Sequence, residues 1–181
     1  MIATLDSLLV CSLTAQAQPQ YPLTLSGGGG GMTTDEQPGL QLSGRMVFHL
    51  GKIGADLGLR EGLSSTGTVG AIFAGPRYSP VPGLHLRTGF AHHHETPMDI
   101  AKQDALGAIA GVAPGIVHRS GLEVGLGVGK ALSTGLASAL PLGERLGWEI
   151  DLGLSWMLDD GGPPVTGWLG LSGTIGVGQA G

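Results

Sequence analysis

The feature that most constrains the fold of this chain is an alternation of apolar residues with polar residues or glycine, in segments of about ten residues. The alternation is clearest between positions 40 and 50, where one set is Leu40, Leu42, Met46, Phe48 and Leu50, and the other is Gln41, Ser43, Arg45 and His49. Successive side chains on a β-strand point to opposite faces. Such a segment therefore forms a strand with one apolar face and one polar face.

The same alternation predicts an all-β fold with eight strands. The predicted strands are Tyr21–Gly31, Leu40–Leu50, Ile53–Arg60, Thr68–Tyr78, Leu84–His94, Gly121–Leu132, Leu146–Leu158 and Val165–Gly178. The connections Gly51-Lys52 and Ser79–Gly83 are short and rich in turn residues. The connection Glu95–His118 is long. The connection Ser133–Arg145 is also long, which makes it the exception at an end that otherwise carries short turns.

Composition leaves two classes of all-β protein open. Charged residues are 13% of the chain, against about a quarter in an average soluble domain, and the apolar run from Ala105 to Val117 is too short for a spanning helix. An apolar chain of this kind either folds around a large soluble core or spans a membrane as a closed barrel. Only nine Lys and Arg within a net charge of −5 argue against a nucleic-acid partner.

The polar faces decide between these two classes. They carry charges of both signs: Arg45, Asp56, Arg60, Arg87, Glu123, Glu149 and Asp151. In a membrane barrel these charges lie inside and must pair, because an isolated buried charge is costly, and the glycines beside them leave room. We predict an eight-stranded antiparallel up-and-down transmembrane β-barrel, with a packed polar lumen and no continuous channel. The alternative is a soluble lipocalin-like carrier of apolar ligands, which the low charge content disfavours.

Aromatic residues near the predicted strand ends also favour a membrane barrel. One group is Tyr21, Phe48, Tyr78 and Trp148, and the other is Phe90, Trp156 and Trp168. Two such groups are expected at the two membrane–water interfaces of a transmembrane barrel.

The first 17 residues have the composition of a secretory signal peptide. Leu8–Leu13 is a short apolar core, and Ala15-Gln16-Ala17 is a small-residue cleavage site. Asp6 and the lack of Lys or Arg near Met1 leave a buried first helix as the alternative. We expect residues 1–17 to be removed and residues 18–181 to form one barrel domain. Its mature form would lack Cys11, which suits an oxidising compartment.

In these patterns the chain resembles the small eight-stranded outer-membrane β-barrel proteins of Gram-negative bacteria. The resemblance covers about Tyr21 to Gly178, and it includes the strand–turn–strand unit from Gly75-Pro76-Arg77-Tyr78 to Leu84–Phe90. Family members usually end on an aromatic residue, whereas this chain ends Val177-Gly178-Gln179-Ala180-Gly181. The resemblance implies a monomer in the outer membrane, contacting its lipids, with a structural or surface-interaction role. We expect no cofactor, and a surface partner would bind through residues 95–118.

A histidine cluster follows Phe90. His92 and His94 would share a strand face, and neutral imidazoles are good ligands for zinc or copper. The alternative is a solvated rim where the strand leaves the membrane. We take these two residues as candidate metal ligands.

Some members of the resembled family are lipid A acylases or deacylases that use a His with a Ser and an acidic residue. The candidates here are His93, Glu95, His118 and Ser120. His118-Arg119-Ser120-Gly121 matches only the first three positions of the His-x-Ser-Asn-type motif. A lipid-modifying enzyme is the alternative to a structural barrel. These residues can form a catalytic triad only if the fold brings them within hydrogen-bond distance of one another.

Overall fold

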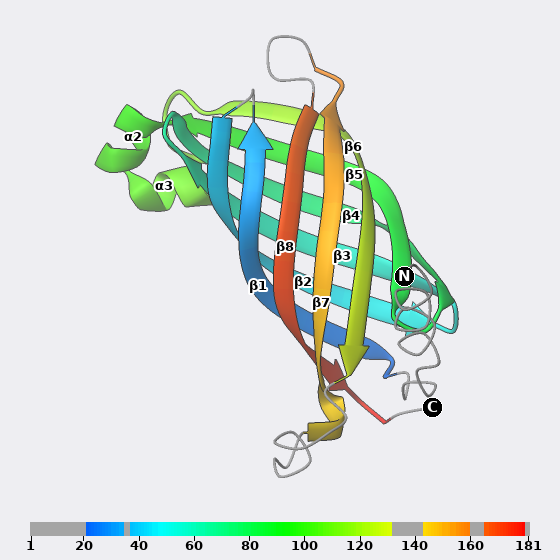
Figure 1. The fold of residues 1–181 in the computed structure, drawn as a ribbon. Helices are drawn as coiled ribbons and strands as arrows, with labels where there is room; N and C mark the ends of the chain where they lie inside the picture. The colour runs from blue at the N-terminus through cyan, green and yellow to red at the C-terminus, as the bar shows by residue number, and fades with distance from the viewer. Residues whose placement is uncertain (1–20, 35–36, 132–142, 160–164, 180–181) are drawn as a thin grey trace, which may run out of the picture.

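The structure, a computed structural model, describes residues 21–34, 37–131, 143–159 and 165–179. These residues form a closed barrel in which each strand pairs antiparallel with its sequence neighbours and β1 pairs with β8 (Figure 1). The strands are β1 (Leu23–Thr34), β2 (Gln37–Leu50), β3 (Ile53–Ser64), β4 (Gly67–Val81), β5 (Leu84–Pro97), β6 (Val117–Ala131), β7 (Leu146–Met157) and β8 (Val165–Val177). The predicted eight-stranded up-and-down barrel is confirmed.

Several strands extend further than predicted at one end of the barrel. For example, β3 continues to Ser64 and β6 already begins at Val117. These extensions carry polar residues and glycine, so their hydropathy no longer alternates, although their backbones still pair in the sheet. The predicted leader, residues 1–17, and most of the connection 133–145 lie outside the described residues. Within the latter, Gly143–Arg145 form a short 3₁₀ turn, η2.

The two ends of the barrel differ in their connections. The turn end contains the start of β1, the end of β8 and the tight turns β2–β3 and β4–β5. Gly51 (φ +68°) and Gly83 (φ +82°) adopt the positive φ that these turns need, and Pro82 before Gly83 fits a type II turn. The opposite end, the loop end, carries α2 (Met98–Gln103) and α3 (Ala105–Ala110).

The sequence did not predict these two short helices inside the long connection. The carboxylate of Asp104 accepts a hydrogen bond from Gly107 N at 2.9 Å at the start of α3, which satisfies a free helical N–H. The helix ends at Gly111, whose φ of +71° is the usual left-handed C-cap. No helix in the described part of the chain has the length and hydropathy needed to cross a membrane.

The aliphatic faces of the strands point outward and the polar faces point inward. Leu152, in the middle of β7, is 50% exposed, whereas Glu123 on the neighbouring strand is 0% exposed. We call the outward residues the apolar belt; its members include Leu40, Leu57, Leu59, Ile72, Phe90, Leu122, Leu152, Trp156, Leu169 and Leu171. This arrangement is the reverse of the lipocalin-like alternative, which needs the aliphatic faces inside.

One aromatic residue is on the face opposite to the predicted one. Trp168 is only 7% exposed and points into the lumen, so its assignment to an interfacial girdle is wrong. It alternates with Leu169 and Leu171, which are both exposed. Since these leucines face outward, the period of two requires Trp168 to face inward. Phe90 and Trp156 do lie on the outside.

Candidate functional site

The lumen is filled by paired charges. Among the described residues, its inward side chains include five arginines (Arg45, Arg60, Arg77, Arg87 and Arg119) and five carboxylates (Asp56, Glu95, Glu123, Glu149 and Asp151). All seven residues that the sequence suggested for an interior network are in this set. Matched charges of opposite sign offset the cost of removing them from water.

Near the turn end, Arg45 is the centre of the network. Its guanidinium lies 2.6 Å from Asp151, 2.7 Å from Glu149 and 3.2 Å from Asp56. Arg77 donates to the second oxygen of Glu149 at 3.0 Å. Because these residues come from β2, β3, β4 and β7, the network links strands across the lumen as well as neighbours in the sheet.

Glu123 on β6 is the centre of the next layer toward the loop end. Arg60 binds both of its carboxylate oxygens, one of them at 2.9 Å. Arg87 lies 3.5 Å from the same carboxylate, and Ser155 Oγ donates to it at 2.6 Å. This carboxylate is thus neutralised by two guanidinium groups and bonded by a hydroxyl group.

Glycines opposite the long side chains provide the space for this network. Gly58 pairs with Arg45 in the sheet, and a Cβ there would lie 2.9 Å from Arg45 Cγ. Gly125 pairs with Arg87, and a Cβ there would lie 3.1 Å from Arg87 Cγ. Both separations are shorter than an ordinary van der Waals contact. The high glycine content therefore has a specific steric role inside the barrel.

Aromatic rings complete the packing around the arginines. The guanidinium groups of Arg60 and Arg87 lie 4.6 Å and 4.4 Å from the ring centroid of Trp168, and Arg87 also lies 5.1 Å from that of Phe73. These distances allow cation–π attraction. Trp168 packs with Met32 and Val69 in an apolar cluster. The voids beside Trp168 are only about 20 Å³ and 10 Å³, close to the size of single waters.

A larger cavity of about 440 Å³ opens at the turn end, with His85 and Glu149 among its lining residues. His85, Glu149 and Asp151 place ligand atoms within 4.8 Å of one another, close enough to share a metal ion. Both carboxylates, however, already bind Arg45. Because this guanidinium supplies the positive charge, we interpret the group as part of the ion-pair network.

The packed lumen predicts negligible conductance. Between the cavity and the loop end, side chains of the described residues fill the lumen. They belong to the Arg45 layer, the Glu123 layer and the Trp168 cluster. A purified and refolded barrel in a planar lipid bilayer should give no steady current above the protein-free baseline. Regular, ion-selective current steps would contradict this prediction.

The structure does not bring the four candidate catalytic residues to one face. His93 points into the lumen and is buried. Glu95 also points inward and lies 3.5 Å from Arg119. His118 and Ser120 have the opposite parity on β6 from buried Arg119, so they face outward. A triad built from His93 or Glu95 with Ser120 would have to cross the barrel wall.

His92, rather than His93, is the histidine beside Ser120. The two residues are direct partners in the β5–β6 register, and His92 Nδ1 lies 3.0 Å from Ser120 Oγ. His92 Nε2 lies 3.3 Å from His118 Nδ1, with the two rings stacked at 5.4 Å. Asp159 accepts a hydrogen bond from Ser120 N at 2.6 Å. These four residues form what we call the rim cluster.

The two candidate metal ligands share the outward face, but their ring nitrogens have different partners. His94 Nε2 lies 3.8 Å from Glu61 Oε2, whereas His92 binds Ser120 and His118. The His118 ring lies 6.4 Å from that of His94. In this arrangement His92 and His118 could share an ion, whereas His94 is directed toward Glu61.

Comparison with solved structures identifies the fold. The chain is similar to the N-terminal β-barrel domain of Pseudomonas aeruginosa OprF, with 15% identity, a TM-score of 0.51, and coverage of 86% of this chain and 98% of that one. It is also similar to Neisserial surface protein A (NspA), with 12% identity, a TM-score of 0.56, and coverage of 86% and 96%. No family model and no curated protein sequence matches. The fold is that of the small eight-stranded outer-membrane β-barrels of Gram-negative bacteria.

Proposed function

We propose that this protein is inserted in the outer membrane of a Gram-negative bacterium as a closed, monomeric barrel with a structural or surface-interaction role. The observation that carries the proposal is the reversed polarity of the barrel, with aliphatic side chains such as Leu152 outside and fully buried charges such as Glu123 inside. This polarity suits a surrounding of lipid. Residues 1–17 would direct the chain through the inner membrane, and the loop end, which carries residues 95–118, would lie on the outer side of the membrane.

Heat-modifiability in membrane fractions tests this proposal. The full chain would be expressed in a Gram-negative host, and outer-membrane samples would be run with and without boiling on a denaturing gel. A closed barrel should resist detergent until boiled, so its band should shift. A matched variant truncated before Val165 lacks β8, cannot close, and should show no shift. Recovery of the full chain in the soluble periplasm without a shift would contradict the proposal.

The rim cluster favours one second candidate function, hydrolysis of an ester in an outer-leaflet lipid. Ser120 Oγ lies within hydrogen-bond distance of an imidazole, as a serine nucleophile requires of its general base. His92 could accept the hydroxyl proton, and His118 could orient the ring of His92. The outward direction of these residues would give them access to a lipid from the side of the barrel.

Lipid analysis separates this candidate from a purely structural role. If the rim cluster is catalytic, expression of the unaltered chain should remove acyl chains from lipid A, and Ser120→Ala and His92→Ala should abolish the change. His93→Ala serves as the matched control, because His93 is adjacent in sequence but faces the lumen. An unchanged lipid A profile with the unaltered, correctly inserted chain would contradict the enzymatic role.

A further inference from the structure

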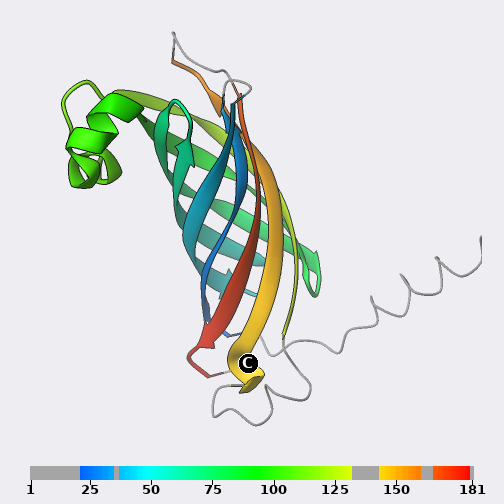
Figure 2. The same cartoon turned by 60° about the vertical axis from the view of Figure 1, so that its left-hand side comes forward.

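The α2–α3 segment, which we define as residues 98–113, lies beside the barrel wall. Figures 1 and 2 show both helices displaced to the side of the barrel at the loop end. The segment contacts β4 and β5, and it buries Ala101, Ala108 and Ala113. These small side chains allow a close approach to the wall. The segment therefore has an inner side against the barrel and an outer side facing away from it.

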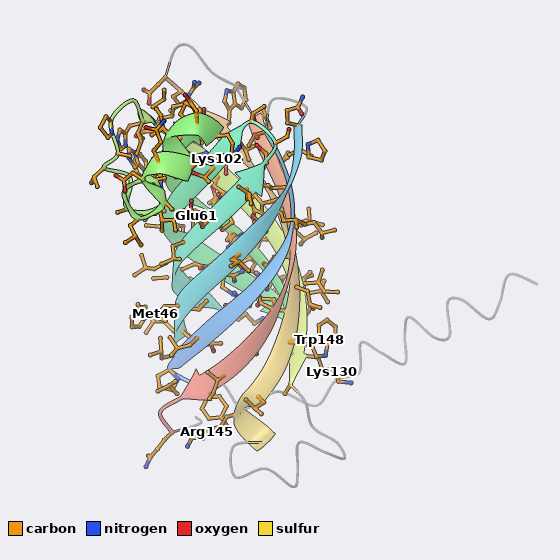
Figure 3. The ribbon with its side chains drawn as sticks, turned by 90° about the vertical axis from the view of Figure 1, so that its left-hand side faces the viewer. Met46, Glu61, Lys102, Lys130, Arg145 and Trp148 are labelled. Atoms are coloured by element: carbon orange, nitrogen blue, oxygen red, sulfur yellow. The ribbon has the colours of Figure 1, made fainter. Side chains whose placement is uncertain are left out.

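Beneath the inner side lies a polar row on the outward face of the barrel. Glu61, Gly70, His94 and His118 are successive partners across β3, β4, β5 and β6. Since Gly70 has no side chain, Glu61 and His94 approach each other across it, to 3.8 Å. Figure 3 shows the helices in front of the wall just above Glu61. His94 is only 8% exposed although it points away from the lumen.

The outer side of the segment is apolar. Leu106 is 81% exposed, Ile109 is 54% exposed and Val112 is 76% exposed. Leu106 and Ile109 are three residues apart on α3 and so lie on one face, whereas Gly107 and Ala108 between them are buried. Exposure of three large aliphatic side chains on one short segment marks a surface that contacts another apolar phase.

The position of the segment indicates which phase this is. On β3 and β4, the row of the sheet next to Glu61–His94 contains Leu59 and Ile72, which are exposed members of the apolar belt. The segment contacts β4, the strand that carries Ile72. The segment thus lies beside the surface that the proposed function places in lipid. The charged residues of α2, Asp99 and Lys102, are exposed.

We propose that the α2–α3 segment is an interfacial membrane anchor, which places Leu106, Ile109 and Val112 among the acyl chains of the outer leaflet. The inference rests on the proposed membrane insertion. A short amphipathic segment of this kind lies in the plane of the interface, with its apolar side in the acyl region. Anchoring would also shield the Glu61–His94 pair from lipid. This shielding is stabilising, because exposure of polar groups to the acyl chains is costly.

Lipid-quenching measurements test the anchor. Single cysteines would replace Leu106, Val112 or Lys102 in a full chain that also carries Cys11→Ser, and each would be labelled with an environment-sensitive fluorophore. The proteins would be reconstituted in phosphatidylcholine vesicles with and without brominated acyl chains. Quenching at positions 106 and 112 should be several times stronger than at position 102, because only the former lie in the acyl region.

A label at Leu152→Cys, in the middle of the apolar belt, separates the anchor from membrane insertion itself. Strong quenching at position 152 with none at position 106 or 112 would overturn the anchor and leave the inserted barrel intact. Absence of quenching at position 152 would instead overturn the insertion. Labels at 106 and 112 that are shielded from aqueous iodide but not quenched by brominated lipid would indicate a protein partner, which also overturns the lipid anchor.

Discussion

Replacement of Glu123 by alanine should lower the free energy of unfolding by about 3–5 kcal/mol, the usual cost of removing one partner from a buried ion pair. The carboxylate is fully buried and binds Arg60, Arg87 and Ser155. Its loss leaves two guanidinium groups close together without their counter-ion. Urea unfolding in phosphatidylcholine vesicles, followed by tryptophan fluorescence and extrapolated linearly, measures the change.

Two further variants define what the Glu123 measurement means. Glu123→Gln keeps the shape and an acceptor for Ser155 but removes the charge, so it should fall between the unaltered chain and Glu123→Ala. Asp99→Ala removes an exposed carboxylate on α2 and should change the free energy of unfolding by less than about 1 kcal/mol. If Glu123→Ala were as mild as Asp99→Ala, the ion pairs would not be a principal source of stability in the lumen.

The alternation of residues carried most of the information about the barrel. A period of two fixes which side chains share a face, and a closed sheet fixes that one face is the lumen. Arg45 and Glu123 could therefore be assigned to the interior without knowing their partners. The partners could not be predicted, because Arg45 and Asp151 are 106 positions apart and meet across the lumen. Such contacts depend on the register and tilt of the whole barrel.

Two interior residues show where the sequence reading was incomplete. Closeness to a strand end predicts an interfacial Trp168, whereas alternation with the exposed Leu169 places Trp168 inside. Arg77 follows Pro76, in a strand whose register shifts between Tyr78 and Val81, so its face was ambiguous from hydropathy alone. Both residues now belong to the packing that fills the lumen.

The histidines of the rim show a different limit of prediction from sequence. Three consecutive histidines on one strand must alternate between faces, so His93 cannot share a face with His92 and His94. The parity that groups His92 with His94 therefore separates His93 from Ser120, which pairs with His92. That His92 meets Ser120 follows from the β5–β6 register, which composition does not set. The low exposure of His94 likewise depends on tertiary packing, since Gly111 at the end of α3 lies beside its ring.

A charged side chain placed in the apolar belt should destabilise the inserted barrel, and the loss should increase with the depth of the residue in the bilayer. Leu152→Arg should lower the free energy of unfolding in vesicles by about 2–4 kcal/mol, the cost of an arginine on the lipid face near the bilayer midplane. Leu152 is outward and lies in a row with Leu126 and Leu169, which are also exposed. In water, the same change at an exposed site would alter stability by no more than about 0.5 kcal/mol.

Leu50→Arg is the matched control for this measurement. Leu50 is also outward and exposed, but it ends β2 beside the turn at Gly51, where an arginine should cost only about 0–1 kcal/mol because it reaches the headgroups. A large loss at position 152 with a small loss at position 50 requires a hydrocarbon layer around the middle of the barrel. Equal and negligible losses at both positions would mean that water surrounds the apolar belt, and the barrel would then need a different apolar partner to cover it.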